Sequence, residues 1–415
     1  MQKSNTPKTI AIIGAGGRGQ VFTSLIGNYK HLGRVVAVAE PRDQYRRAVA
    51  EAAGIPPAMQ FKTWQEFAAR PRLCDAAIIS TMDRDHKGPA VACLKKGYDL
   101  LLEKPLATTL ADCRAIEAAQ RKSGGIVAVC HSLRYQKGLT NLKEMVAGGM
   151  IGEVMSIDQI EPVAPWHQAH SFVRGNWRNT ACSTFMLLAK SCHDIDFIAY
   201  LVGKPCLRVS SFGALSFFRR ENAPKGAPAR CTDGCPVEFE CPYSAYKAYV
   251  NTDNRETWPA NVVSFDHSQE AHLEAIRTGP YGRCVFRCDN DVVDHQVVAM
   301  VFENDITATF TMTAFGEGGR QMRVHGTKGE IKVTQNTISV RTFADNNTSV
   351  ISIGNEGGAH GGGDNRVVRL WLEALHEGND RKIITNAQES LRTHTIAFAA
   401  EKSRLEKRMI RIADM

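Results

Sequence analysis

The feature that most constrains the fold is a glycine-rich turn near the start of the chain. Gly14, Gly16 and Gly19 stand in the pattern G-x-G-x-x-G, directly after the apolar run 10–13 and before a helix-forming stretch. In this strand–turn–helix context the first glycine allows a tight turn, the second lets a pyrophosphate approach the backbone, and the third lets helix and strand pack closely. The turn therefore predicts a Rossmann unit that binds a dinucleotide, with free N–H groups at the helix start as phosphate ligands.

The order of predicted elements indicates an α/β fold. In the first third of the chain, helical patterns alternate with strand-like runs at 9–13, 35–39, 76–79, 99–102 and 126–130, which is typical of a doubly wound parallel sheet. After residue 149 come the strand-like runs 151–160, 296–302, 306–315, 321–325 and 330–333, which favour a large open, mostly antiparallel sheet. A chain of 415 residues is long enough for two domains. We expect an N-terminal Rossmann domain over 1–131 and a C-terminal α/β substrate-binding domain over 132–415, with a Cys-rich insert at about 217–287.

An acidic residue at the end of the second predicted strand indicates which dinucleotide is bound. Glu40 lies about where a carboxylate meets the hydroxyls of the adenosine ribose, and its charge disfavours a 2′-phosphate. NAD is therefore expected as the cofactor. Arg42, two residues further on, could bind a 2′-phosphate, so NADP is the weaker alternative. The other residues predicted to contact the cofactor are Gly17, Arg18, Thr81, His86, Glu103 and Lys104.

A second group of residues suggests a family. Glu103-Lys104-Pro105 follows the strand 99–102, so Lys104 lies at the carboxyl edge of the sheet, where open α/β folds bind ligands. A lysine there can hydrogen-bond a substrate hydroxyl and stabilise charge that develops on its oxygen. With GAGGRG, TMDRDH, KSCHDID and HGTKGEI, this tripeptide makes the chain resemble the glucose–fructose oxidoreductase / inositol dehydrogenase (Gfo/Idh/MocA) family over nearly its whole length.

The resemblance implies that Lys104 and His193 are catalytic and bind substrate. His193 would act as general base on the hydroxyl that loses hydride, a role suited to an imidazole. Many family members carry Asp four residues before this His, but here that position is Ala189, with Lys190 beside it and Asp194 directly after the His. An inward-pointing Lys190 would favour an anionic sugar, whereas an outward-pointing one would leave the pocket unchanged.

Further polar and aromatic residues are predicted to bind the substrate. They are His131 and Arg134 after the last Rossmann strand, then Trp166, His170, Arg174, Trp177 and Arg178, together with Lys190 and Asp194. Flat rings and forked donors suit sugars and anionic groups, although a loop at a subunit interface would carry the same residues. His360 and Asp364 flank a Gly-rich loop, 354–363, that could close over the substrate.

Three functions are consistent with this pattern. The first is an NAD-dependent oxidoreductase that removes hydride from a ring hydroxyl, at C3, of a sugar or glycoside. The alternative is an NAD-dependent glycoside hydrolase that oxidises C3 transiently, eliminates the C1 group, adds water and returns the hydride, on an anionic substrate such as a sulfonated glycoside. Extra acid/base groups near His193 would favour the hydrolase, and Asp194, Tyr135 and His131 are available. A third function, a non-catalytic NAD sensor, is disfavoured by the intact Lys104 and His193.

The net charge and the cysteine content limit which partners and metals we expect. The net charge of +8 forms no long basic run, so neither nucleic acid nor a membrane is an expected partner. No signal peptide or membrane span is visible, so we expect a cytoplasmic protein with reduced thiols, and a homodimer or homotetramer built on the open sheet. Cys231, Cys235 and Cys241 give C-x3-C-x5-C, with Cys284 and Cys288 downstream. This spacing leaves structural zinc as an alternative to free thiols in the insert.

Overall fold

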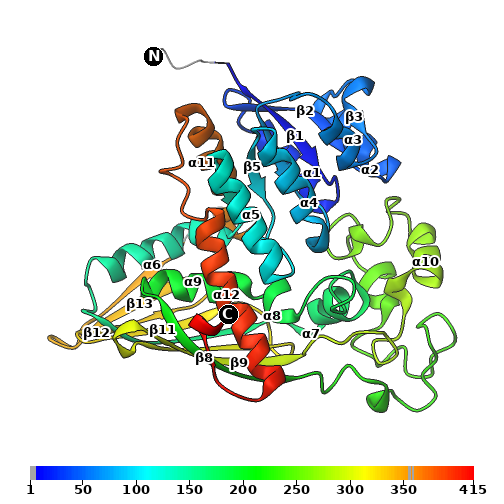
Figure 1. Cartoon of the computed structure of the whole chain (residues 1–415). Helices are drawn as coiled ribbons and strands as arrows, with labels where there is room; N and C mark the ends of the chain where they lie inside the picture. The colour runs from blue at the N-terminus through cyan, green and yellow to red at the C-terminus, as the bar shows by residue number, and fades with distance from the viewer. Residues whose placement is uncertain (1–5, 354–356, 358) are drawn as a thin grey trace.

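The computed structural model describes residues 6–353, 357 and 359–415 (Figure 1). The predicted loop 354–363 falls partly outside the described residues, as does the side chain of His360. Among the helices that are described, none has the length and apolar character needed to cross a membrane.

The first sheet is parallel and carries the glycine-rich turn. Its strands are β1 (Lys8–Ile13), β2 (Gly33–Ala39), β3 (Gln60–Phe61), β4 (Ala76–Ile79), β5 (Asp99–Leu102) and β6 (Val127–Val129), in the order β3-β2-β1-β4-β5-β6. The helices between them are α1 (Gly17–Gly27), α2 (Asp43–Ala53), α3 (Trp64–Ala69), α4 (Lys87–Lys95) and α5 (Leu110–Ser123). The strand order reverses between β1 and β4, so a crevice opens at the carboxyl ends of these two strands. The predicted doubly wound parallel sheet is confirmed.

A helix from the far end of the chain completes the core of this first sheet. α11 (Gly363–Glu377) buries Trp371 fully among Ile10 and Ile12 of β1 and Phe22 of α1. The sequence analysis expects this segment within the C-terminal domain, 132–415. α11 lies beside the blue and cyan Rossmann elements in Figure 1.

The second sheet is mixed and mostly antiparallel. Its strands are β7 (Val154–Pro162), β8 (Cys206–Ala214), β9 (His295–Phe302), β10 (Thr307–Thr313), β11 (Gln321–Gly326), β12 (Gly329–Val333), β13 (Thr337–Thr342), β14 (Thr348–Ser352) and β15 (Ile410–Arg411), in the order β14-β13-β12-β11-β7-β10-β9-β8-β15. β7 and β10 run parallel. The central strands alternate buried and exposed residues, as expected for a sheet with one solvated face. This confirms the predicted open, mostly antiparallel sheet.

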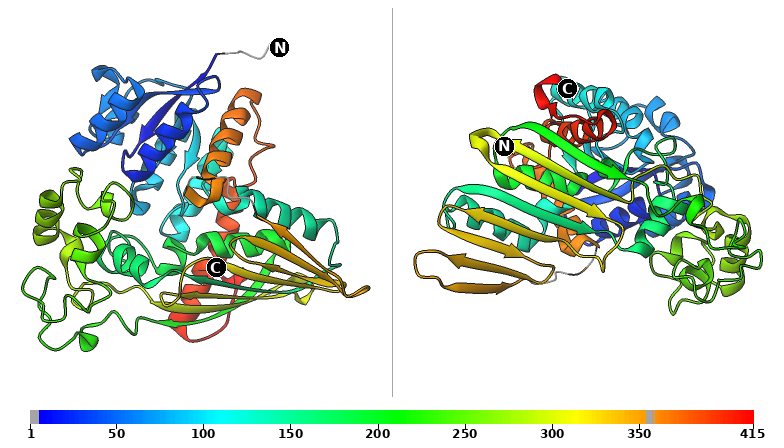
Figure 2. Two further views of the ribbon diagram at one scale, coloured as in Figure 1. Left: turned by 180° about the vertical axis from the view of Figure 1, so that it is seen from behind. Right: turned by 90° about the horizontal axis from the view of Figure 1, so that it is seen from below.

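Helices cover only one face of the second sheet. α6 (Lys137–Ala147), α9 (Cys192–Val202) and α12 (Ala387–Glu406) lie between it and the Rossmann layer (Figures 1 and 2). α12 packs against α5 on one side and against α9 and β8 on the other, so it joins the two layers. The opposite face is open, as the view from below in Figure 2 shows.

The Cys-rich insert stands apart from both sheets. Its longest helix is α10 (Gln269–Thr278). One small apolar cluster lies within the insert, and a second packs it against Ala169, Val173 and Ala314. It also touches the Rossmann layer, because the ring of Phe265 meets that of Tyr45 on α2 at 5.3 Å between centroids. The insert therefore borders the crevice between the two layers.

Candidate active site

The glycine-rich turn packs tightly against neighbouring backbone at Gly14 and Gly19 but has free space at Gly17. Gly14 has φ +92°, and a Cβ there would lie 2.5 Å from the Ser80 carbonyl oxygen. A Cβ on Gly19 would lie 2.1 Å from the Gly14 oxygen, whereas one on Gly17 would meet no atom within 4 Å. No side chain caps the start of α1 at Gly16. The N–H groups of the helix start therefore face open space, which fits a pyrophosphate.

Glu40 is fixed beside this turn. Its carboxylate is 3% exposed and accepts hydrogen bonds from Ala15 N at 2.9 Å and Arg42 Nε at 2.7 Å. Burial alone would raise the pKa of Glu40, but the bonds from Arg42 and Ala15 outweigh it and lower that pKa. The guanidinium of Arg42 lies 3.9 Å from the ring centre of Tyr45. Glu40 is thus an ionised acceptor at the edge of the turn, where a ribose hydroxyl could reach it.

We predict that Glu40→Ala narrows the preference for NAD over NADP. The change removes the acceptor for the ribose hydroxyls and frees Arg42 to bind a 2′-phosphate. Hydrogen bonds to charged groups contribute about 1.5–3 kcal/mol, so the ratio of the two dissociation constants should shift about 10- to 100-fold. Calorimetric titration of both dinucleotides measures this, and an unchanged ratio would remove Glu40 from cofactor selection.

Several other residues predicted to bind the cofactor have partners within the protein. Arg18 Nε lies 2.5 Å from Glu103 and its Nη1 lies 2.7 Å from Asp364 at the start of α11. Despite burial, these two carboxylates raise the pKa of Arg18. His86 Nδ1 donates to the Pro105 carbonyl oxygen at 2.7 Å. Arg18, Glu103 and His86 therefore shape the loops around the crevice.

Thr81 differs from these residues. It follows β4 at the crevice, and its Oγ1 is buried with no hydrogen-bond partner among the described residues. An orphaned hydroxyl at this edge of the sheet fits contact with a bound dinucleotide.

The structure brings Lys104 to the end of a short helix that lies four residues before His193. Lys104 follows β5, and its Nζ donates to the Ala189 carbonyl oxygen at 2.6 Å. Ala189 ends the short helix α8 (Met186–Ala189), and His193 lies in the first turn of α9, where it is 3% exposed. The ammonium thus lies next to the backbone of residue 189. Lys104, which follows β5, and His193, on α9, thus come from different layers of the fold.

A cluster of histidines packs around His193. The ring of His131 lies edge-on to that of His193, with 5.9 Å between centroids, and to that of His394, at 5.3 Å. His131 is fully buried, and burial lowers its pKa; burial also lowers the pKa of His394 to about 3. His131 therefore packs between His193 and His394, and its Nδ1 lies 3.7 Å from Asp196. Its contact with a substrate stays a prediction.

Charged side chains line the crevice next to this cluster. Lys190 Nζ lies 3.1 Å from Glu161 on β7, and Arg320, just before β11, lies 2.7 Å from Asp194 and 3.3 Å from Glu161. Lys190 therefore points inward. Burial raises the pKa of Asp194 and so does Glu161, although Arg320 opposes them. Arg320 and Glu161 were missed by the sequence analysis; the Gly318-Gly319-Arg320 turn before a strand is the signal that could have drawn attention to Arg320.

An aromatic wall borders the same charges. Trp166, 51% exposed, stacks on His167 with 5.5 Å between centroids, and Trp258 of the insert meets both rings edge-on at 5.2 and 4.9 Å. Burial lowers the pKa of His167 to about 3, helped by nearby Lys190 and Lys104. His167 therefore ties the aromatic wall to the charged cluster. Trp166 was predicted, whereas His167 and Trp258 were not.

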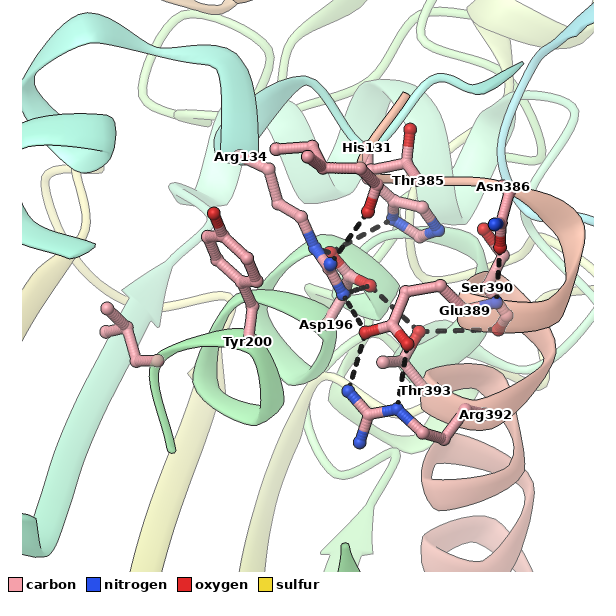
Figure 3. Close-up of polar contacts among 12 residues, drawn as sticks. His131, Arg134, Asp196, Tyr200, Thr385, Asn386, Glu389, Ser390, Arg392 and Thr393 are labelled. Carbon is pink, nitrogen blue, oxygen red and sulfur yellow. Dashed lines mark hydrogen bonds and ion pairs between the residues drawn. The ribbon is translucent and has the colours of Figure 1, made fainter. Parts of the chain in front are cut away.

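Arg134 is bound by carboxylates within the protein. Its guanidinium is 1% exposed and forms two 2.7 Å bonds with Asp196 of α9 and one of 3.0 Å with Glu389 of α12 (Figure 3). Thr393 also donates to Asp196 at 2.9 Å. Asp196 lies three residues after His193, so this network anchors the helix that carries the predicted base. The carboxylates of Asp196 and Glu389 bind the donors of Arg134, which argues against its predicted contact with a substrate.

Four more predicted substrate ligands are held in the same way. Arg174 Nε donates to the Arg283 oxygen at 2.7 Å, and Arg178 Nε lies 2.8 Å from Asp289. His170 bonds Tyr249 at 3.0 Å, and Trp177 Nε1 donates to Asp83 at 2.9 Å. These contacts join the insert and the Rossmann loops to the rest of the chain. These four side chains have partners within the chain, and their contact with a substrate stays a prediction.

The zinc alternative is not supported. Within the described residues, no group of three or more His, Cys, Asp or Glu side chains is arranged to hold a metal ion. All twelve cysteines are free thiols.

The sequence matches two profiles of one family. Residues 8–131 match the oxidoreductase family profile described as an NAD-binding Rossmann fold, and residues 143–412 match that of its C-terminal alpha/beta domain. The chain belongs to the Gfo/Idh/MocA oxidoreductase family. It is accordingly an enzyme of the NAD-binding oxidoreductase type.

Similar proteins agree with this family. A protein named as an oxidoreductase, YteT of Bacillus subtilis, is 27% identical over 325 residues, which are 74% of this chain and 73% of YteT. Inositol 2-dehydrogenase of Gluconacetobacter diazotrophicus is 32% identical over 150 residues, 36% of this chain and 44% of that protein. The match therefore spans less than half of the inositol dehydrogenase.

Solved structures share the fold. An oxidoreductase from Agrobacterium radiobacter in complex with NAD+, L-tartaric acid and magnesium has a TM-score of 0.71 at 14% identity, covering 99% of this chain and 100% of that one. The scyllo-inositol dehydrogenase from Lactobacillus casei with NAD(H) and scyllo-inositol has a TM-score of 0.67 at 15% identity, covering 98% and 99%.

Proposed function

We propose that this family member oxidises a ring hydroxyl of a sugar or cyclic polyol with NAD as hydride acceptor. The observation that carries the proposal is the hydrogen bond from Lys104 Nζ to the carbonyl oxygen of Ala189, which ends α8 four residues before His193. A cation and a titratable imidazole then face the crevice where the glycine-rich turn would place a dinucleotide. The names of the inositol dehydrogenases among the relatives point to the same class of substrate.

His193 and Lys104 have complementary roles in this proposal. The imidazole of His193 takes the proton from the hydroxyl whose carbon loses hydride, while the Lys104 ammonium donates to the same oxygen and stabilises its growing charge. The nicotinamide, when bound, supplies the hydride acceptor. The substrate hydroxyl would replace the Ala189 carbonyl as the Lys104 partner, and the family resemblance indicates C3 as the carbon oxidised.

The charges in the crevice favour a substrate that carries an anionic group. Lys104, Lys190 and Arg320 supply three cations, whereas Glu161 and Asp194 supply two carboxylates. A carboxylate or sulfonate on the sugar would balance the excess positive charge, since a charge-assisted hydrogen bond is stronger than a neutral one.

Glycoside hydrolysis is the alternative reaction, but the extra acid/base groups it would need are engaged elsewhere. Asp194 is fully buried and bonded to Arg320. Tyr135 is 2% exposed and its hydroxyl bonds Thr385 at 2.9 Å. His131 is buried behind His193. These contacts favour net oxidation.

One assay separates the two reactions and tests the substrate class. The enzyme and NAD are incubated with inositols and with neutral, carboxylated and sulfonated nitrophenyl glycosides, while reduced nicotinamide and nitrophenol are followed together. We expect reduced nicotinamide to accumulate without nitrophenol, with higher kcat/KM for the anionic sugars, and a substrate deuterated at C3 to react more slowly. Nitrophenol release without accumulation would establish the hydrolase, and a preference for neutral sugars would exclude the anionic class.

Trp166→Ala should weaken sugar binding without changing stability. Its ring is half exposed and held by His167 and Trp258, and aromatic contacts of this kind contribute about 0.5–1.5 kcal/mol. We expect KM to rise about 2- to 12-fold, with kcat nearly unchanged. Phe239→Ala is the control, since that ring is 89% exposed in the insert. Equal KM values in the two variants would exclude Trp166 from the sugar site.

The open face of the second sheet supports a homodimer or homotetramer. Phe212 on β8 is 72% exposed and lies opposite Val297 on β9, which is 42% exposed. Paired apolar side chains on an open sheet are typical of an interface. Phe212→Glu should lower the mass in solution measured by light scattering, and a wild-type protein that is monomeric at all concentrations would contradict this proposal.

A further inference from the structure

A buried histidine from the C-terminal end of the chain contacts the loop that carries Lys104. His394 lies on α12, the helix between the two layers (Figure 1), and its side chain is fully buried. Its Nε2 accepts a hydrogen bond from the backbone N–H of Leu106 at 3.0 Å. Leu106 stands two residues after Lys104 and 288 positions before His394. This bond therefore ties α12 directly to the loop of the proposed active-site lysine.

The loop after β5 is held at successive residues. The N–H of Lys104 donates to Oε2 of Glu103 at 3.0 Å, and the carbonyl oxygen of Pro105 bonds Nδ1 of His86 at 2.7 Å. The next residue, Leu106, is fully buried, and a buried backbone N–H needs a hydrogen-bond partner. The backbone on the far side of Lys104 is thus fixed by a side chain of the other layer.

The imidazole of His394 remains an acceptor over the ordinary pH range. Only an unprotonated ring nitrogen can accept a hydrogen bond, so the bond from Leu106 requires the neutral ring. Burial lowers the pKa of His394 to about 3, and the neighbouring His131 and Lys104 lower it further. The Lys104 ammonium therefore lies close enough to His394 to favour the neutral form that holds its own loop.

The same ring also contacts the histidines beside the proposed base. It lies edge-on to His131, with 5.3 Å between centroids, and His131 lies edge-on to His193, at 5.9 Å. His394 thus touches the backbone that follows Lys104 and also the ring that packs on His193. One side chain of α12 contacts both parts of the proposed catalytic pair's surroundings.

We propose that His394 is a positioning residue that sets the place of Lys104 relative to His193. The proposal rests on the function proposed above for these two residues. His394 acts through the loop: its bond to Leu106 fixes the backbone, so that only the side chain of Lys104 has to turn from the Ala189 oxygen to a substrate hydroxyl. A shift of about 1 Å in a catalytic group can lower a rate about 100-fold.

The test replaces His394 by amides of two lengths. The side-chain oxygen of Gln reaches about as far as Nε2 of histidine, whereas that of Asn reaches only about as far as Nδ1. His394→Gln therefore keeps an acceptor for Leu106 and His394→Asn does not. We expect His394→Asn to lower kcat/KM for the best substrate of the panel about 10- to 100-fold, with NAD affinity nearly unchanged. His394→Gln should restore most of this loss, and His394→Leu, which has no acceptor, should behave like His394→Asn.

Ser403 provides a matched control on the same helix. It is 2% exposed, and its Oγ accepts a hydrogen bond from the backbone N–H of Ser211 on β8 at 3.0 Å. Ser403→Ala therefore removes the same kind of bond from α12 at a place away from the Lys104 loop. It should lower thermal stability and leave kcat and KM unchanged.

A double variant tests whether His394 acts through Lys104. In the Lys104→Ala protein the side chain that His394 positions is gone, so His394→Asn should lower kcat/KM little further. Losses that multiply in full would show that His394 acts independently of Lys104 and would overturn the proposal.

The other outcomes are equally decisive. Wild-type kcat/KM in His394→Asn and His394→Leu, an equal loss of activity in Ser403→Ala, or failure of both acceptor-free variants to fold would each show that the bond is not a positioning device. Crystal structures separate this proposal from the proposed reaction. We expect the loop 104–106 to be displaced in His394→Asn and to stay in place in His394→Gln, and an unmoved loop in His394→Asn overturns the proposal. Wild-type turnover in Lys104→Ala would instead overturn the proposed function, while the loop positions would still decide the role of His394.

Discussion

His193→Ala should lower turnover about 10²- to 10⁴-fold, the contribution typical of a positioned general base. NAD affinity should be nearly unchanged, because His193 lies on α9 and the glycine-rich turn lies on the other layer. The measurement is kcat and KM with the best substrate of the panel, together with NAD titration. A well-folded variant with wild-type turnover would remove His193 as the base.

Lys104→Ala should lower turnover and also raise KM for the sugar. The ammonium contacts the hydroxyl before and during hydride loss, so both binding and reaction depend on it. Lys204→Ala, at an exposed position after α9, is the control. If the role of Lys104 were purely structural, Lys104→Ala would lose thermal stability and NAD binding along with activity.

Arg134→Met should destabilise the protein by about 3–5 kcal/mol, because removal of one partner leaves the other charge of a buried pair uncompensated. The side chains of Arg134 and Asp196 are each 1% exposed. Arg392→Met is the matched control. Arg392 bonds Glu389 in the same network but its side chain is 36% exposed, and such pairs contribute about 0–1 kcal/mol. Chemical denaturation measures both, and equal stability of Arg134→Met and wild type would contradict this role.

The pH dependence of Arg134→Met should have the opposite sign from that of the wild type. In the folded wild type, Arg134 lowers the pKa of Asp196 against the effect of burial. The pair therefore stabilises the fold above the ordinary carboxyl pKa of about 3.9 and loses this effect as pH falls through the lowered value. Without Arg134, burial raises the Asp196 pKa, so the variant should regain stability relative to wild type as pH falls from 7 toward 5.

The sequence predicted those elements whose residue pattern is local. β1, β2 and β4 are short runs rich in β-branched residues, and β5 is a run of leucines. The turn that follows β1 has glycines where a Cβ would clash with the backbone. The alternating residue pattern of β9 and β10 likewise predicted strands of the second sheet, and these strands alternate exposed and buried residues. Lys104 could be placed because a residue that follows a parallel strand lies at the carboxyl edge of the sheet.

The elements and contacts that the sequence analysis did not predict have no local residue pattern. α9 is buried on nearly every side, so its sequence lacks the polar face that marks a surface helix. Arg134 looks like a sugar ligand in sequence, and only the folded chain shows that Asp196 and Glu389, from two distant helices, occupy its donors. Trp258 reaches the crevice only through the path of the insert, which has little periodicity.

The most direct test of the central claim is a crystal structure of the enzyme with NAD bound. We expect the pyrophosphate against the turn from Gly14 to Gly19 and the nicotinamide ring in the crevice, within contact distance of Lys104, with His193 facing the same side of the ring. A nicotinamide bound away from both residues, or separated from them by the insert, would contradict the account of Lys104 and His193 as the catalytic pair.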